Sequence, residues 1–120
     1  MTGLNKFYTP IEDGDVHLWL APLDITAQDN DRYTSLLNAD DQERAARFLN
    51  PDDRDGFVAA RGFLLTILGA YTKTAPDTLR LHYNPYGKPA LYLCENQRNI
   101  QFNLSHSGDW ALLAVTRGRR

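Results

Sequence analysis

The stretch Pro51–Tyr71, PDDRDGFVAARGFLLTILGAY, contains the clearest helical pattern in the chain and determines the expected architecture. Apolar side chains recur in it at three- and four-residue spacing and form one stripe, which consists of Phe57, Ala60, Leu64, Ile67, Leu68 and Tyr71. Such spacing is typical of a helix that packs one face against a core. Pro51 suits the first turn of this helix, where no intrahelical partner is needed for its missing N–H group.

Arg61 falls within this apolar stripe, not opposite it. An arginine in such a place usually extends its aliphatic stem along the apolar surface, so that its charged head reaches water. The alternative is that Arg61 reaches an anion at the edge of a cleft. Both interpretations are open at the level of the sequence.

The segments around the central helix predict a mixed fold. Residues 1–15 lack periodicity and are expected to form an irregular arm. Val16–Ala21 predicts a strand that ends at Pro22, and both faces of this strand look apolar apart from His17, so a buried strand is expected. Further elements are expected as helices at 29–37 and from Asn38 or Asp40 to 48, and as strands at 79–83, 89–93, 100–105 and 110–116. This order predicts the α+β class, with an antiparallel sheet packed against helices.

The bulk properties narrow the possible environments and partners. A chain of 120 residues with a net charge of −2 fits one globular domain and gives no reason to expect nucleic-acid binding. The single cysteine, Cys94, excludes an intramolecular disulfide and is compatible with a reducing cytoplasm. No apolar run approaches membrane-spanning length, and no secretory leader opens the chain. We therefore expect a soluble cytoplasmic protein without membrane or nucleic-acid partners.

A second group of expectations concerns charged and aromatic residues. Six acids crowd the middle of the chain, at Asp40, Asp41, Glu43, Asp52, Asp53 and Asp55. They are interpreted as a solvated helical face, in preference to a metal site. The three histidines lie on separate segments without the spacing of metal ligands, so no metal-binding residue is predicted. Trp19 and Trp110 are expected in the core.

Ser105 and His106 are candidate functional residues at the end of a predicted strand. Neighbours on a strand point to opposite faces, so these two cannot form the nucleophile–base pair of a hydrolase. Anion binding suits them better, because histidine offers N–H donors and serine a hydroxyl, while Ser107-Gly108 adds backbone N–H groups in a tight turn. The alternative is that the polar side chains only satisfy backbone groups near a hairpin.

Lys88 is the second candidate, held between Gly87 and Pro89. Glycine lets the backbone turn and approach a ligand, and proline then sets its direction. A lysine at such a turn is suited to phosphate, although an ordinary surface lysine is the simpler interpretation. Arg44 and Arg47 are most simply helix-surface residues paired with nearby acids.

Four motifs, taken together, favour ligand binding over the simpler interpretations of these residues. In chain order they are Arg44-x-x-Arg47-Phe48, Ala60-Arg61-Gly62-Phe63-Leu64, Tyr86-Gly87-Lys88-Pro89 and Phe102-Asn103-Leu104-Ser105-His106-Ser107. Over residues 16–117 the chain closely resembles the N-terminal half of the surfactin-type 4′-phosphopantetheinyl transferases. That family transfers phosphopantetheine from coenzyme A to a serine of an acyl or peptidyl carrier protein and releases adenosine 3′,5′-bisphosphate. Its fold is a pseudo-dimer of two similar α+β halves with coenzyme A between them.

The resemblance implies roles for six residues in coenzyme A binding. Lys88, Ser105 and His106 would bind the nucleotide end with its 3′-phosphate, and Gly87 would shape the turn beside it. Arg44 and Arg61 match positions that commonly supply positive charge there. Arg47 is a weaker candidate. Convergent cations fit a multiply charged ligand, because they give charge-assisted hydrogen bonds to phosphate.

The resemblance also implies what residues 1–120 do not supply. The second half of the family carries Gly-x-Asp-x-Glu and Trp-x-x-Lys-Glu motifs, which hold magnesium and assist deprotonation of the attacking serine, and neither occurs here. We therefore expect residues 16–117 to form the N-terminal half-domain and 118–120 to begin the link to the other half. This polypeptide alone is expected to contain no catalytic residues and to be inactive.

The expected partners are a carrier protein and either the missing C-terminal half or a second copy in a homodimer. The alternative function is a non-catalytic binding or interaction module that retains only the fold. A small hydrolase that uses Ser105 ranks third, because it would need a separate base.

Overall fold

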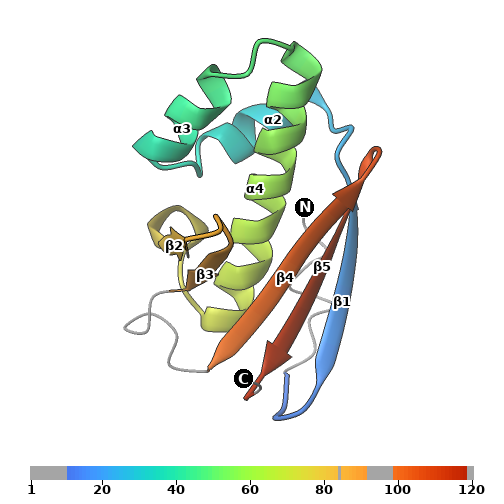
Figure 1. Cartoon of the computed structure of the whole chain (residues 1–120), viewed down its shortest axis with the longest axis vertical. Helices are drawn as coiled ribbons and strands as arrows, with labels where there is room; N and C mark the ends of the chain where they lie inside the picture. Colours follow the sequence, from blue (N-terminus) through green and yellow to red (C-terminus); the bar gives the residue numbers. More distant parts are fainter. Residues whose placement is uncertain (1–10, 84, 92–98, 119–120) are drawn as a thin grey trace.

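A computed structural model describes residues 11–83, 85–91 and 99–118, and it confirms the predicted α+β class (Figure 1). The elements in chain order are β1 (Val16–Pro22), α2 (Ala27–Thr34), α3 (Ala39–Ala46), α4 (Pro51–Thr72), a short 3-10 helix η1 (Pro76–Thr78), β2 (Leu81–Tyr83), β3 (Pro89–Leu91), β4 (Ile100–Ser107) and β5 (Trp110–Arg117). Cys94 and residues 92–93 of the predicted strand at 89–93 lie outside the described residues. None of the described helices is long and apolar enough to cross a membrane.

The strands form two antiparallel sheets. A three-stranded sheet has the order β1-β5-β4, and β2 pairs only with β3 in a separate hairpin. A two-residue turn, Gly108-Asp109, joins β4 to β5, and Ser107 pairs with Trp110 on either side of it. Gly108 has φ +58°, the positive value that a two-residue hairpin turn requires at its first position. The tight turn predicted at this place is therefore confirmed.

Helix α4 lies along one face of the three-stranded sheet and supplies much of the core (Figure 1). Leu64 and Leu68 are fully buried, as are Leu113 and Val115 on the facing strand. The helix begins at an Asn50 cap, whose side-chain oxygen accepts a hydrogen bond of 2.8 Å from the Asp52 backbone N–H. The periodic apolar stripe thus forms the helix that the sequence predicts.

Helices α2 and α3 pack on α4 on the side away from the sheet (Figure 1). Contact with α2 is close at Gly62, where an added Cβ atom would lie 2.1 Å from Cγ of Tyr33. Burial raises the pKa of the Tyr33 phenol above its ordinary value. Asn38 caps α3, because its Oδ1 atom accepts a hydrogen bond of 2.8 Å from the Asp41 backbone N–H.

The prediction of a buried β1 strand is wrong. Val16, Leu18 and Leu20 are 52, 66 and 65 % exposed, whereas the alternate residues of β1 face α4. The exposed side chains share one surface of the sheet with Leu112 and Trp110, as the pairing register of β1 with β5 shows. We call this surface, made by Val16, Leu18, Leu20, Trp110 and Leu112, the outer face. Two apolar faces on one strand can mean an interface as well as burial in a core.

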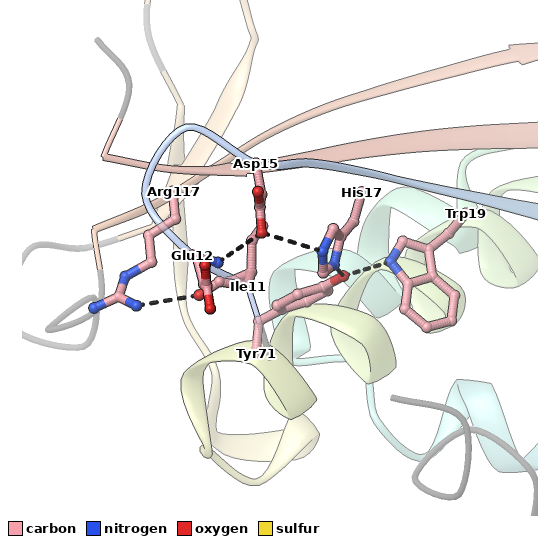
Figure 2. A network of polar contacts seen from close by, with 7 residues as sticks. All are labelled: Ile11, Glu12, Asp15, His17, Trp19, Tyr71 and Arg117. Atoms are coloured by element: carbon pink, nitrogen blue, oxygen red, sulfur yellow. Dashed lines mark hydrogen bonds and ion pairs between the residues drawn. The ribbon is translucent and has the colours of Figure 1, made fainter. Parts of the chain in front are cut away.

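The two tryptophans have different environments. Trp19 is half-buried, and its Nε1 donates a hydrogen bond of 2.8 Å to the hydroxyl of Tyr71, which contacts Nδ1 of His17 at 2.6 Å on its other side (Figure 2). This buried hydroxyl ties β1 to the C-terminal turns of α4. Trp110 is 51 % exposed on the outer face, so its expected place in the core is wrong.

Candidate functional site

The six predicted binding residues come from two helices, one turn and one strand of the fold. Arg44 lies in the last turn of α3, and Arg61 lies on α4. Gly87 and Lys88 lie in the turn that joins β2 to β3, and Ser105 and His106 lie near the end of β4.

Arg61 is buried and lines a cavity, so its charged head does not reach open water as the first interpretation expects. Only 8 % of the residue is exposed, and its Nη1 lies 3.2 and 3.3 Å from the two carboxylate oxygens of Asp41, which is 5 % exposed. The same nitrogen donates a hydrogen bond to the Tyr83 hydroxyl. A carboxylate therefore already compensates the charge of Arg61. The role of direct anion ligand implied by the family resemblance does not fit this environment.

Arg44 shares its aromatic neighbours with Arg61. The Arg44 Cζ atom lies 5.6 Å from the ring centroid of Phe57 and 5.5 Å from that of Tyr83. For Arg61 the corresponding distances are 5.3 and 5.6 Å. Guanidinium groups within about 6 Å of a ring centroid are attracted by the ring quadrupole. Two rings thus hold two arginines in one cluster.

Tyr83 connects this cluster to the turn that carries Lys88. It is the last residue of β2, and its partner across the hairpin is Pro89, the residue after Lys88. Gly87 has φ +83°, a conformation that favours glycine, and an added Cβ there would meet no described atom within 4 Å. Lys88 is exposed beside this open space. The positive φ of Gly87 agrees with the predicted turn, and the approach of a ligand to it stays a prediction.

Ser105 and His106 face opposite sides of the sheet, which agrees with the argument against a Ser–His catalytic pair. Ser105 pairs with Leu112, whose side chain lies on the outer face, and His106 pairs with the buried Ala111. His106 therefore points to the side on which α4 lies. There it lines a cleft of about 860 Å³ between the N-terminal ends of α2 and α4 and the Gly108-Asp109 turn.

This cleft is strongly acidic. Six aspartates line it: Asp24, Asp31, Asp52, Asp53, Asp55 and Asp109. Carboxylates repel phosphate, so the interior of the cleft is a poor place for an anionic nucleotide, and only its rim near His106 suits one. In the part of the chain that the structure describes, the lining includes His106 but none of the other five predicted residues. Phe57 lines the cleft together with His106, and its ring also belongs to the arginine cluster.

The acidic residues in the middle of the sequence therefore lie in two different environments. Asp52, Asp53 and Asp55 are exposed, as predicted for a solvated face, whereas Asp41 is buried as the partner of Arg61. No group of three or more histidine, cysteine, aspartate or glutamate side chains that could hold a metal ion occurs among residues 11–83, 85–91 and 99–118.

Three residues of the cluster were not identified from the sequence. Asp41 was assigned to the solvated acidic face, Phe57 to the apolar stripe, and Tyr83 to the end of a strand. An arginine within an apolar stripe signals a buried partner, but periodicity cannot show which of several nearby acids provides it.

Comparisons with known proteins identify the family of the chain. Residues 24–118 match the family model for the N-terminal domain of 4′-phosphopantetheinyl transferases. The chain is 39 % identical over 106 residues to the 4′-phosphopantetheinyl transferase HetI of Nostoc sp. strain PCC 7120. The chain belongs to the 4′-phosphopantetheinyl transferase family. The alignment with HetI covers 88 % of this chain and 45 % of HetI, so the chain spans about half the length of that relative.

Solved structures with little sequence similarity show the same fold. Holo-[acyl-carrier-protein] synthase of Helicobacter pylori, solved in complex with coenzyme A, superposes with a TM-score of 0.60 at 10 % identity, over 87 % of this chain and all of that chain. The corresponding synthase of Neisseria meningitidis gives a TM-score of 0.51 at 13 % identity, over 87 % of this chain and 97 % of that chain. At such identities the similarity concerns the fold of this phosphopantetheinyl transferase family member, and it supports the predicted class.

Proposed function

We propose that this chain is the coenzyme A-binding N-terminal half of a surfactin-type 4′-phosphopantetheinyl transferase. The whole enzyme would move phosphopantetheine from coenzyme A to a serine of an acyl or peptidyl carrier protein in the cytoplasm and release adenosine 3′,5′-bisphosphate. The observation that carries this proposal is the family match over residues 24–118, which spans Arg44, Lys88, Ser105 and His106.

The geometry supports a binding role for Arg44, Lys88 and His106, whereas Ser105 lies on the opposite side of the sheet from His106. Tyr83 pairs with Pro89, the residue after Lys88, and its ring centroid lies 5.5 Å from Cζ of Arg44. His106 lines the cleft that also includes Phe57. These donor side chains come from α3, from the turn between β2 and β3, and from β4. Phosphate groups of coenzyme A would gain charge-assisted hydrogen bonds from such donors, in which lysine acts as a point charge and arginine as a planar fork.

The chemical step would need groups from outside residues 1–120. The described residues do not fit a magnesium site, because they offer no group of three or more potential ligands. We propose that the carboxylates for magnesium belong to the C-terminal part of the whole enzyme. Residues 1–120 bind and orient coenzyme A in this proposal, and they do not deprotonate the attacking serine.

The outer face is the surface we propose for the second half of the enzyme. Its five apolar side chains are between 40 and 66 % exposed, and a contiguous apolar surface of this kind usually marks an interaction site. When the chain is isolated, a second copy would cover this surface in a two-fold homodimer.

Sedimentation velocity tests this interface. Residues 1–120 should sediment as a dimer at micromolar concentration, and Leu20→Lys should give a monomer because it places a charge in the outer face. Leu49→Lys is the matched control, since Leu49 is fully exposed away from the sheet and its replacement should leave the dimer intact. A monodisperse wild-type monomer across micromolar concentrations would count against the homodimer.

Titration calorimetry with coenzyme A tests the binding role. Hydrogen bonds to charged groups contribute about 1.5–3 kcal/mol, so Lys88→Ala or His106→Ala should each weaken binding by roughly ten- to one-hundred-fold. Arg47→Ala is the control, because Arg47 is the exposed C-cap residue of the helix that carries Arg44 and pairs with Glu43. Equal affinity of all four proteins would contradict the assigned site.

A second candidate function follows from the acidic cleft. Six aspartates beside His106 favour a non-catalytic interaction module that retains the fold without the nucleotide pocket. The same calorimetry separates the two functions, since the absence of heat with millimolar coenzyme A would favour the module.

A further inference from the structure

We propose that Asp41, Arg61 and Tyr83 are positioning residues, which hold the guanidinium group of Arg44 in place to receive a phosphate of the nucleotide. Arg61 itself then does not contact the ligand. The inference rests on the proposed function, which supplies the anionic ligand, but the arrangement of the four residues can be tested without it.

The first step concerns the charge of Arg61. Its guanidinium is buried and contacts both oxygens of Asp41, so the pair carries no net charge. The cavity beside this pair, about 460 Å³ in volume, is also lined by Asp40 and Asp77. Three carboxylates around one guanidinium repel a phosphate from that side. Arg61 is therefore in the wrong environment to bind an anion directly.

The second step concerns the ring of Tyr83. Its hydroxyl accepts a hydrogen bond from Arg61, which restricts the orientation of a side chain that is 39 % exposed. The opposite wall of the cluster is Phe57, whose ring lies 5.6 Å from that of Phe48. The ion pair of Arg61 thus fixes Tyr83, and Tyr83 and Phe57 together present two ring faces to a second guanidinium.

The third step concerns Arg44, which occupies that position. Its side chain is exposed, and among the described residues no carboxylate forms an ion pair with it. Its neighbour Arg47, one turn further along the chain, pairs with Glu43 instead. Arg44 is a cation held by two rings at the base of the Lys88 turn, with its charge uncompensated by these residues.

Nuclear magnetic resonance of the arginine side chains tests the arrangement in the 120-residue chain. The rings should shift the Hε resonance of Arg44 upfield from that of Arg47 in the wild type. Tyr83→Leu should move the Arg44 resonance toward that of Arg47, whereas Tyr83→Phe should leave most of the shift because it keeps the ring. An Arg44 resonance that coincides with that of Arg47 in the wild type would overturn the inference.

A double-mutant cycle with coenzyme A then tests the role. Arg44→Ala and Tyr83→Leu should each raise the dissociation constant about tenfold, and the double variant should bind no more weakly than Arg44→Ala alone. Independent, multiplicative losses would show that Tyr83 does not act through Arg44. A shifted Arg44 resonance without any coenzyme A binding would contradict the proposed function and the ligand role of Arg44. It would still show that Tyr83 holds Arg44 in place. Binding with an unshifted resonance would overturn the present inference alone.

Discussion

Replacement of Asp41 by asparagine should lower the free energy of unfolding. Among the described residues, no other single replacement of an acid should lower it as much. The substitution keeps the shape of the side chain and one oxygen acceptor, but it removes the charge opposite Arg61. The two side chains are 8 and 9 % exposed, so solvent screens the pair very little. Breaking a buried pair by removal of one partner costs about 3–5 kcal/mol, and the remaining amide oxygen and Tyr83 hydroxyl place the expected loss near the lower limit.

That loss is large for a chain of this size. A domain of 120 residues is expected to have a free energy of unfolding of about 6–18 kcal/mol, so Asp41→Asn removes between a sixth and a half of it. Urea unfolding followed by circular dichroism should show a midpoint lowered by about 1–3 M, with the slope of the transition unchanged. Asp40→Asn is the control, because Asp40 is exposed in the first turn of the same helix and should change stability by less than about 1 kcal/mol.

A combined variant tests whether the loss of stability comes from an uncompensated buried charge or only from a lost favourable contact. Asp41→Leu with Arg61→Met removes both charges at once, and it should recover most of the stability that Asp41→Asn loses, because no uncompensated guanidinium remains. The reasoning would be refuted if Asp41→Asn and Asp40→Asn had the same midpoint. It would also be refuted if the combined variant were less stable than Asp41→Asn.

Three further predictions follow from the packing and from the proposed division of the enzyme. Gly62→Ala should destabilise the protein by about 1–3 kcal/mol in thermal unfolding, because the new Cβ atom would overlap the Tyr33 ring. Gly56→Ala is the control. Gly56 lies on the same helix with open space around it, so this replacement should be neutral or stabilising. Tyr71→Phe should cost about 1–2 kcal/mol because the Trp19 indole N–H loses its acceptor, and an unchanged unfolding curve would speak against that hydrogen bond. Residues 1–120 with magnesium, coenzyme A and apo carrier protein should give no holo carrier protein by mass spectrometry, and product formation would disprove the division of roles.

The sequence predicted those parts of the fold that depend on local pattern. The stripe at three- and four-residue spacing predicted α4, and Gly108 predicted the hairpin of β4 and β5. Asn38 and Asp40 were the two candidate caps of α3, and Asn38 is the cap. In each case neighbouring residues decide the local conformation, so the information is contained in the segment itself.

Long-range placement was less predictable, for physical reasons that particular residues illustrate. The apolar surfaces of β1 do not reveal whether the outer one meets a core or a partner, and Leu18 is exposed in this chain. Arg61 forms an ion pair with Asp41, which lies twenty positions away on another helix, and the periodicity of the sequence does not predict that pairing. The candidate site follows the same rule: Gly87 and Lys88 were identifiable as a turn, whereas the connection through Tyr83 to Arg44 required the fold.

The measurement that tests the central claim most directly is a titration of the isotope-labelled chain with adenosine 3′,5′-bisphosphate, followed by nuclear magnetic resonance. If one nucleotide site is built from several elements, the backbone amides of Gly87, Lys88, Ser105 and His106 should shift together and saturate with one dissociation constant. Shifts confined to one of the two segments would contradict the account, as would shifts that do not saturate.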